Sequence, residues 1–414
     1  MKNKFKKDVI LTILIQGLIA VSNLCILFLI TRNFGTEDYG DFYLIKRMSD
    51  LFWVTLLFGL TVSVPRNIYK VKYFENILIV SLSITLISSI LVVIFPNKIL
   101  NFFISENSYI FQFKILIISQ IIFGITNAIF RGLEKFIVFN ILNVINFIIS
   151  PLFAFTISDN IGEYIYNLAV VSLTINLMIS LSIISIFFLK NRNFNFNLFD
   201  IKYIVLYGFK RLPGLLIASF IFTLPIFVID NFNIDEFKGY VSQIFQFYSF
   251  ILLPINTLGT LLLPKISKTV HLNNKKEYTV FKEKLIYMYI TIVSMGFIMC
   301  LFIPLILNII NFNFNFSFSI IMIILGIIPL SIYNLLRNPI DAITEKPWTS
   351  YIVICSFLIS IILLVFMSYL NFEKTIIISI FILSLYSLLG LFSIIVFNMI
   401  NRRFLDDTSY FNRP

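Results

Sequence analysis

Lys46, Arg47 and Asp50 are the residues of this sequence whose types and spacing point most directly to chemistry. On a helix, Lys46 and Asp50 are one i,i+4 step apart and Arg47 and Asp50 one i,i+3 step apart, so all three share a face and can pair. One carboxylate cannot neutralise two cations, which leaves a net positive charge. A group with this balance is suited to holding an anion.

The surrounding residues are apolar, which makes these charges costly. The run from Leu51 to Val62 is too short to cross a bilayer, so a spanning helix must include residues 42–50. Each charge facing lipid near the bilayer centre would cost about 2.5–3.5 kcal/mol. Two interpretations stay open. Lys46 and Arg47 snorkel to the outer interface with Asp50 capping them, or the three line a water-filled cavity and bind an anionic group.

Twelve long apolar runs must position this group. Mean hydropathy is +0.94, and 59% of residues are hydrophobic while 13% are charged. A spanning helix needs about 20 apolar residues, and lipid offers no partner for a free backbone amide, so the sequence predicts an all-α integral membrane protein with about twelve transmembrane helices. The predicted spans are 9–31, 42–64, 77–95, 115–129, 137–157, 165–189, 212–229, 239–263, 285–309, 320–336, 348–370 and 376–399.

The basic residues indicate the orientation of the spans. Of the 32 Lys and Arg, 25 fall in the two termini and the alternate loops on the same side. Because cytoplasmic loops are enriched in Lys and Arg, both termini are predicted to be cytoplasmic. Topology and nearby anionic lipid explain the net charge of +11 without a nucleic-acid partner.

A weak internal repeat predicts two halves. Gly40 and Pro65 in the first half match Gly239 and Pro264 in the second, with the same spacing. Both copies begin between the first and second spans of a six-span unit, which predicts two six-helix lobes related by a pseudo-two-fold axis along the membrane normal. The predicted divisions are an N-terminal lobe over 1–190, a cytoplasmic amphipathic linker over 191–211 that lies on the membrane surface, and a C-terminal lobe over 212–414.

Several further polar residues are candidates for substrate contact. In the second copy, Gln246 and Ser249 occupy the positions of Arg47 and Asp50, with Gln243 on the same side. Lys210, Arg211 and Arg337 lie near the inner ends of their spans, where topology is the alternative explanation. Pro213, next to Lys210 and Arg211, is expected to break or start a helix. Asn143 and Asn146 are expected to form hydrogen bonds between helices.

The cysteines and the histidine of the sequence do not point to a metal or cofactor site. Cys25, Cys300 and Cys355 fall inside predicted spans and have no metal-ligand or disulfide spacing. His271, the one histidine, is predicted to lie in a cytoplasmic loop. No cofactor and no metal site are therefore expected, and few groups are available as a general base.

The loop from Arg32 to Phe42, which reads RNFGTEDYGDF, together with Gly59–Leu60, Pro65–Arg66 and Arg131–Gly132, resembles the polysaccharide (O-antigen type) flippases. These belong to the multidrug/oligosaccharidyl-lipid/polysaccharide exporter superfamily. The likeness covers the whole chain in span count and repeat, and it is specific mainly over residues 31–66.

This resemblance implies a flippase of the bacterial cytoplasmic membrane. It would move undecaprenyl-diphosphate-linked oligosaccharide units from the inner to the outer leaflet by alternating access, for lipopolysaccharide or capsule biosynthesis. Cations in a central cavity would bind the diphosphate or an acidic sugar. Coupling to H⁺ or Na⁺ is expected, with Asp50, the only carboxylate deep in a span, as the candidate residue. The protein would act as a monomer, with a polymerase as a functional partner.

Two other functions stay open. A small-molecule or drug exporter of the same superfamily would bind organic cations and favour carboxylates within the spans, whereas cations prevail here. A membrane glycan polymerase or ligase would need an acid, base or nucleophile at the membrane surface and typically a large outer loop. No predicted outer loop exceeds roughly 20 residues, so the chain is not expected to be an enzyme.

Overall fold

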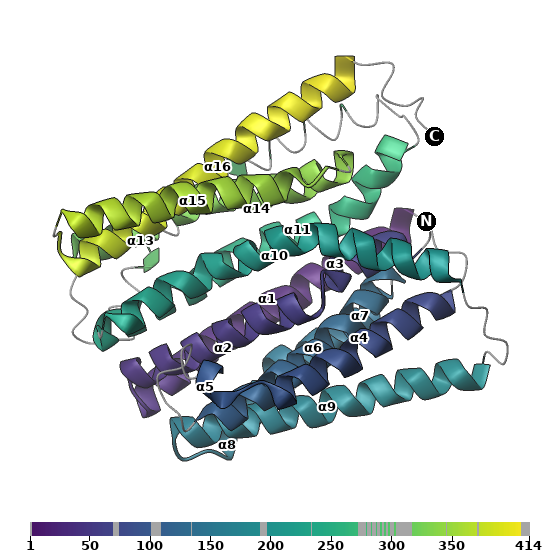
Figure 1. Cartoon of the computed structure of the whole chain (residues 1–414), viewed down its shortest axis with the longest axis horizontal. Helices are drawn as coiled ribbons and strands as arrows, with labels where there is room; N and C mark the ends of the chain where they lie inside the picture. Colours follow the sequence, from purple (N-terminus) through teal and green to yellow (C-terminus); the bar gives the residue numbers. More distant parts are fainter. Residues whose placement is uncertain are drawn as a thin grey trace. The chain divides into compact units, whose positions relative to one another are not determined.

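The computed structural model describes residues 2–68, 74–100, 109–133, 135–190, 197–232, 234–271, 317–344, 346–370 and 372–406, with isolated positions between 279 and 303. Within these ranges every regular element is a helix (Figure 1). The prediction of an all-α membrane protein is confirmed. The chain divides into two compact units, Met1–Ser242 and Gln243–Pro414. The predicted lobe boundaries at 190 and 212 stay a prediction.

The first unit contains ten helices of the described chain and the start of an eleventh. They are α1 (Lys2–Asn33), α2 (Thr36–Leu56), α3 (Leu60–Asn67), α4 (Phe74–Ile94), α5 (Asn97–Leu100), α6 (Ile110–Gly132), α7 (Phe136–Val144), α8 (Ser150–Thr156), α9 (Ile161–Lys190), α10 (Leu198–Asn231) and the beginning of α11 (Asp235–His271). A π-helical turn, η2 (Ile145–Ile149), joins α7 to α8. Helix α2 packs against α6 and α10.

The second unit contains the rest of α11 and four further helices in its described part. These are α13 (Phe318–Leu325), α14 (Ile327–Ile343), α15 (Trp348–Tyr369) and α16 (Lys374–Asp406). Helix α16 packs along both α14 and α15 (Figure 1). The Tyr248 hydroxyl on α11 donates a hydrogen bond to the Ile323 carbonyl at the end of α13.

Nine helices in the described ranges are long and apolar enough to cross a membrane. Three of the twelve predicted spans are not among these nine helices. Span 42–64 carries the charged group and is divided between α2 and α3, and span 239–263 lies within α11. Span 285–309 lies outside the described residues apart from isolated positions. The chain is thus a multi-pass membrane protein.

The predicted single helix over 42–64 is wrong because the backbone breaks between Leu56 and Leu60. Phe58 has a φ of 48° and Gly59 a φ of 74°, both in the left-handed region that ends a helix. A Cβ atom at Gly59 would also collide with the Gly208 carbonyl of α10. Only glycine fits at this crossing of α3 and α10.

Helix α10 shows the opposite departure, since it is longer than predicted. It runs unbroken for 34 residues, through both Pro213 and Pro225, and is therefore about 51 Å long. The expected break at Pro213 is wrong. Residues 198–211 of the predicted surface linker belong to this helix (Figure 1), and residues 191–196 lie outside the described ranges.

The interior of the first unit is held by amides as well as by apolar side chains. Asn146 and Asn176 donate to each other at 3.0 and 2.8 Å, and Asn176 also donates to the Ser119 hydroxyl at 3.1 Å. Asn127 donates to Asn143 at 3.0 Å. The prediction that Asn143 and Asn146 bond between helices is confirmed, and such bonds tie helices together where lipid offers no partner.

Candidate functional site

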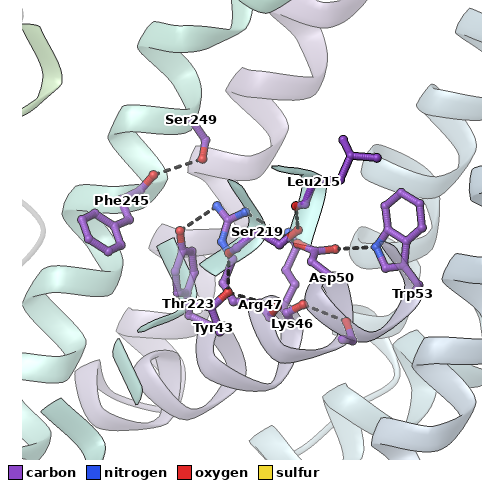
Figure 2. A network of polar contacts seen from close by, with 11 residues as sticks. Tyr43, Lys46, Arg47, Asp50, Trp53, Leu215, Ser219, Thr223, Phe245 and Ser249 are labelled. Atoms are coloured by element: carbon purple, nitrogen blue, oxygen red, sulfur yellow. Dashed lines mark hydrogen bonds and ion pairs between the residues drawn. The ribbon is translucent and has the colours of Figure 1, made fainter. Parts of the chain in front are cut away.

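Arg47 is the centre of the polar group on α2 (Figure 2). Its Nη2 donates a hydrogen bond of 2.7 Å to the Tyr43 hydroxyl, one helical turn away. Its Nη1 lies 3.6 Å from Asp50 Oδ2, and the two side chains keep 19% and 30% of their surface exposed. Arg47 is thus held in a fixed direction but is not sealed from solvent.

Aromatic rings hold the Arg47 guanidinium from two helices. Its central carbon lies 4.8 Å from the Tyr43 ring centroid and 5.3 Å from that of Phe222 on α10. Both distances fall within the range of cation–π attraction. Next to Phe222, the Thr223 hydroxyl donates to the Ser219 carbonyl at 2.9 Å and lies 3.4 Å from the Arg47 carbonyl. Helix α10 therefore helps to set the position of Arg47.

Asp50 has a second partner on the same helix. The Trp53 indole nitrogen donates to Asp50 Oδ1 at 3.2 Å, on the side away from Arg47 (Figure 2). The expected pairing of Lys46 with Asp50 is not found among the ion pairs of the described residues, where Asp50 pairs with Arg47. The Lys46 ammonium instead lies 5.9 Å from the Phe42 ring centroid.

The net charge of this group remains positive, because Asp50 offsets only one of the two cations. The arrangement presents a planar guanidinium beside the Tyr43 and Phe222 rings, with Trp53 on the far side of Asp50. A guanidinium fork can pair with two oxygens of a phosphate or carboxylate at once, and flat aromatic faces suit the apolar faces of a sugar ring. The group therefore has the chemistry to bind an anion or a glycan.

Of the other predicted site residues, the two that belong to the first unit, Lys210 and Arg211, lie apart from this group. Arg211 is buried on α10 over the Tyr207 ring, at 5.6 Å. It lies eleven residues before Phe222, so about 16 Å further toward the inner end. Lys210 beside it is exposed. Gln243 and Gln246 are buried on α11 and Arg337 is half-buried on α14, all in the second unit.

Sequence reasoning missed Tyr43, Phe222 and Thr223. Tyr43 could have been found, because it lies four residues before Arg47 on the same face. Phe222 and Thr223 follow only from the packing of α10 on α2, which the sequence does not encode locally.

No group of three or more His, Cys, Asp and Glu in the described ranges is arranged to hold a metal ion. Cys25 and Cys355 are free thiols. His271 and Cys300 have no described side chain.

The family of the chain follows from its sequence as a whole. A family model described as "Polysaccharide biosynthesis protein" matches residues 5–270, which include the entire polar group on α2 and α10. The chain belongs to this family. The resemblance predicted from the Arg32–Phe42 loop is thereby confirmed. A search of curated proteins finds no match.

Solved structures with a similar fold are membrane transporters. A mutant of the Vibrio cholerae MATE transporter VcmN aligns with a TM-score of 0.64 at 13% identity and covers 99% of both chains. The MATE multidrug transporter DinF-BH, solved in complex with a ligand, aligns with a TM-score of 0.65 at 14% identity, covering 99% of this chain and 96% of its own. An outward-facing multidrug resistance MATE family transporter of the MOP superfamily gives 0.66 at 14% identity, over 97% and 96%. This polysaccharide biosynthesis family member has the MATE transporter fold.

Proposed function

We propose that this protein is a flippase that moves undecaprenyl-diphosphate-linked oligosaccharide units from the inner to the outer leaflet of the bacterial cytoplasmic membrane. The observation that carries the proposal is the Arg47 guanidinium, held between Tyr43 and Phe222, in a group with Lys46 and Asp50 whose net charge is positive. Membership of a polysaccharide biosynthesis family and a transporter fold support the same function.

The substrate chemistry fits this group. A diphosphate linker carries roughly two negative charges, which a guanidinium fork and a nearby ammonium can neutralise. The sugar head would contact the half-buried Trp53 and Phe222 rings, while the polyprenyl tail stays in lipid. An inside-negative membrane potential would favour outward movement of the anion by about 2.3 kcal/mol per charge per 100 mV.

The other candidate residues have supporting parts in this proposal. Arg211, buried nearer the inner end of α10, would meet the diphosphate first, with Lys210 drawing it from the leaflet surface. Gln243, Gln246 and Arg337 would contact the sugar head. Asp50 is the candidate for coupling to H⁺ or Na⁺, because it is a half-buried carboxylate that shares Arg47 with the substrate.

The proposed cycle forms and breaks no covalent bond. Extension of the glycan would belong to a separate polymerase acting on the delivered unit, and the protein would work as a monomer. O-antigen or capsule assembly would consume the product.

A small-molecule exporter is the second candidate, because the solved structures with this fold include multidrug transporters. The balance of charge favours the flippase, since an exporter of organic cations needs unpaired carboxylates within its spans. In the polar group on α2, Asp50 is already paired with Arg47 and bound by Trp53.

The leaflet location of the lipid-linked oligosaccharide tests the proposal. Cells with and without the protein would be treated with a glycan-reactive probe that cannot cross the membrane. Accumulation on the inner leaflet without the protein, relieved by re-expression, is the expected result. An unchanged leaflet distribution with normal surface glycan, combined with increased sensitivity to organic cations, would replace the flippase by the exporter.

A further inference from the structure

Lys238, at the start of α11, lies in a buried cluster that the proposed transport chemistry does not use. Only 4% of its side chain is exposed. Its ammonium donates to Asp41 of α2 at 2.7 Å and to Asp230 of α10 at 2.8 Å, and it lies 3.2 Å from Asp235 of its own helix. The lysine thus joins three helices at the end of the first unit that is predicted to face outside.

The backbones also meet at this point. A Cβ atom on Gly239 would lie 2.5 Å from Thr36 Cγ2 and 2.6 Å from the Thr36 carbonyl oxygen. On the facing side, a Cβ atom on Gly40 would lie 3.3 Å from the Gly239 amide nitrogen and from the Lys238 stem. Gly40 and Gly239 are the matched glycines of the internal repeat, so equivalent positions of the two copies touch each other.

We propose that Lys238 and Gly239 form a latch that fastens the outer ends of α10 and α11 to α2 and closes the outer side of the Arg47 group. The latch lies at the outer end of the α2–α10 contact, above Arg47, Phe222 and Thr223. The Gly59–Gly208 crossing lies at the inner end of the same contact.

The charges of the latch suit repeated opening. When α11 leaves α2, Lys238 loses Asp41 but keeps Asp230 and Asp235, which travel with it. The buried cation is therefore paired in both states, which avoids the large cost of an uncompensated buried charge. Asp41, with 26% of its side chain exposed, already has access to water.

Two further features of the latch are the charge of Lys238 and the packing of α2. Burial would lower the pKa of Lys238, but its hydrogen bonds to Asp230 and Asp41 and the charges of both raise it above the ordinary value, so the ammonium stays protonated. The outer end of α2 also packs on α9, since the Phe42 ring lies 5.2 Å from that of Tyr164, edge to face. This contact holds α2 in place independently of Lys238.

Helix α10 can rotate about the Gly59–Gly208 crossing, and this rotation would open the latch. Asp230 lies 22 residues from Gly208 along the unbroken helix α10, so the latch is roughly 33 Å from the crossing. A rotation of α10 by about 10° around that crossing would move the latch by about 6 Å, which is enough to separate Lys238 from Asp41 and admit water to Ser219 and Thr223.

Thiol labelling from outside tests the latch in the full-length protein. Ser219, on α10 beside the Arg47 group (Figure 2), would be replaced by Cys after Cys25, Cys300 and Cys355 are replaced by Ser. Intact cells would then be treated with a membrane-impermeant maleimide. Asp41→Asn should raise the labelling rate at position 219 by at least about threefold, because it weakens the closed state alone.

Matched variants separate the latch from general charge effects. Asp235→Asn makes the same replacement at a carboxylate that is 55% exposed and stays with Lys238, so labelling should not change. Gly239→Ala should raise labelling through its clash with the Thr36 backbone, whereas Gly17→Ala, with nothing within 4 Å, should not. The amount of full-length protein in the membrane would be measured for each variant. If Asp41→Asn is not inserted, the labelling rate of Gly239→Ala tests the latch in its place.

Labelling at the parent rate in the inserted Asp41→Asn variant, or an equal increase in Asp235→Asn, would overturn the latch. This assay needs no substrate. Its failure would therefore leave the flippase proposal intact, and a negative leaflet assay would leave the latch intact.

Discussion

Replacement of Arg47 by Lys asks whether the site on α2 needs a positive charge alone or a guanidinium held in one direction. The Arg47→Lys variant keeps the charge, but an ammonium cannot lie flat between the Tyr43 and Phe222 rings or offer two parallel donors. If direction matters, binding of a diphosphate should weaken although the net charge is unchanged.

The structure gives the size of the expected effect. The guanidinium lies 4.8 and 5.3 Å from two ring centroids, and each such contact contributes about 0.5–2 kcal/mol. A hydrogen bond to a charged group, such as the one to Tyr43, contributes about 1.5–3 kcal/mol. Lysine would recover most of this by remaining near the same rings, so a net loss of about 1–2 kcal/mol is expected, or about 5- to 30-fold in Kd.

Binding of lipid-linked oligosaccharide to the purified variants in lipid nanodiscs would measure this effect. Arg32→Lys is the matched control, because the Arg32 guanidinium lies 5.8 Å from the Phe28 ring centroid but is exposed at the outer end of α1. It should bind within about twofold of the parent. If Arg47→Lys also binds within this margin, charge alone suffices, and the argument from the aromatic enclosure of Arg47 fails.

Three further predictions follow from other parts of the structure. Asp50→Asn should preserve substrate binding, since it removes a negative charge beside Arg47, but it should abolish the dependence of transport on an imposed H⁺ or Na⁺ gradient. If transport by this variant in vesicles still responds to the gradient, Asp50 is not the coupling residue. Gly59→Ala should lower the free energy of unfolding by about 1–3 kcal/mol, because the residue has a positive φ and faces the Gly208 carbonyl. Gly17→Ala, in the open interior of helix α1, should melt at or slightly above the parent temperature. Asn176→Ala should cost about 0.6–1.7 kcal/mol by removing the amide pair with Asn146, as measured by thermal unfolding in detergent.

The spans could be predicted from the sequence because each consists of an apolar run long enough to cross lipid, and lipid leaves such a run no alternative to a helix. The break at Phe58–Gly59 could not, since a single glycine in the run LLFGLTV is compatible with an unbroken helix. Its cause lies in the approach of Gly208, more than a hundred residues away. Pro213 led to a predicted break that does not exist, because helix α10 continues through it.

The polar group on α2 could be predicted only in part, because some of its contacts lie along one helix and others join two helices. The pairing of Arg47 with Asp50 depends on spacing along one helix, which the sequence contains. The choice between Lys46 and Arg47 as the partner of Asp50 depends on Tyr43 and Phe222, which hold Arg47 in place. From the sequence, Lys238 is only a basic residue in the short loop before the predicted span 239–263. Its burial among three carboxylates arises from contacts between helices.

The reciprocal amide pair of Asn146 and Asn176 joins η2 to α9 through groups that have no net charge and do not titrate. Neither a proton gradient nor a change of membrane voltage alters the strength of this attachment. A membrane protein driven by such gradients needs an interior that does not respond to them, or the driving force would loosen the bundle instead of moving it. Because these amides carry no net charge, a voltage acts instead on the charged residues of the first unit, among them Arg47 and Asp50 of α2.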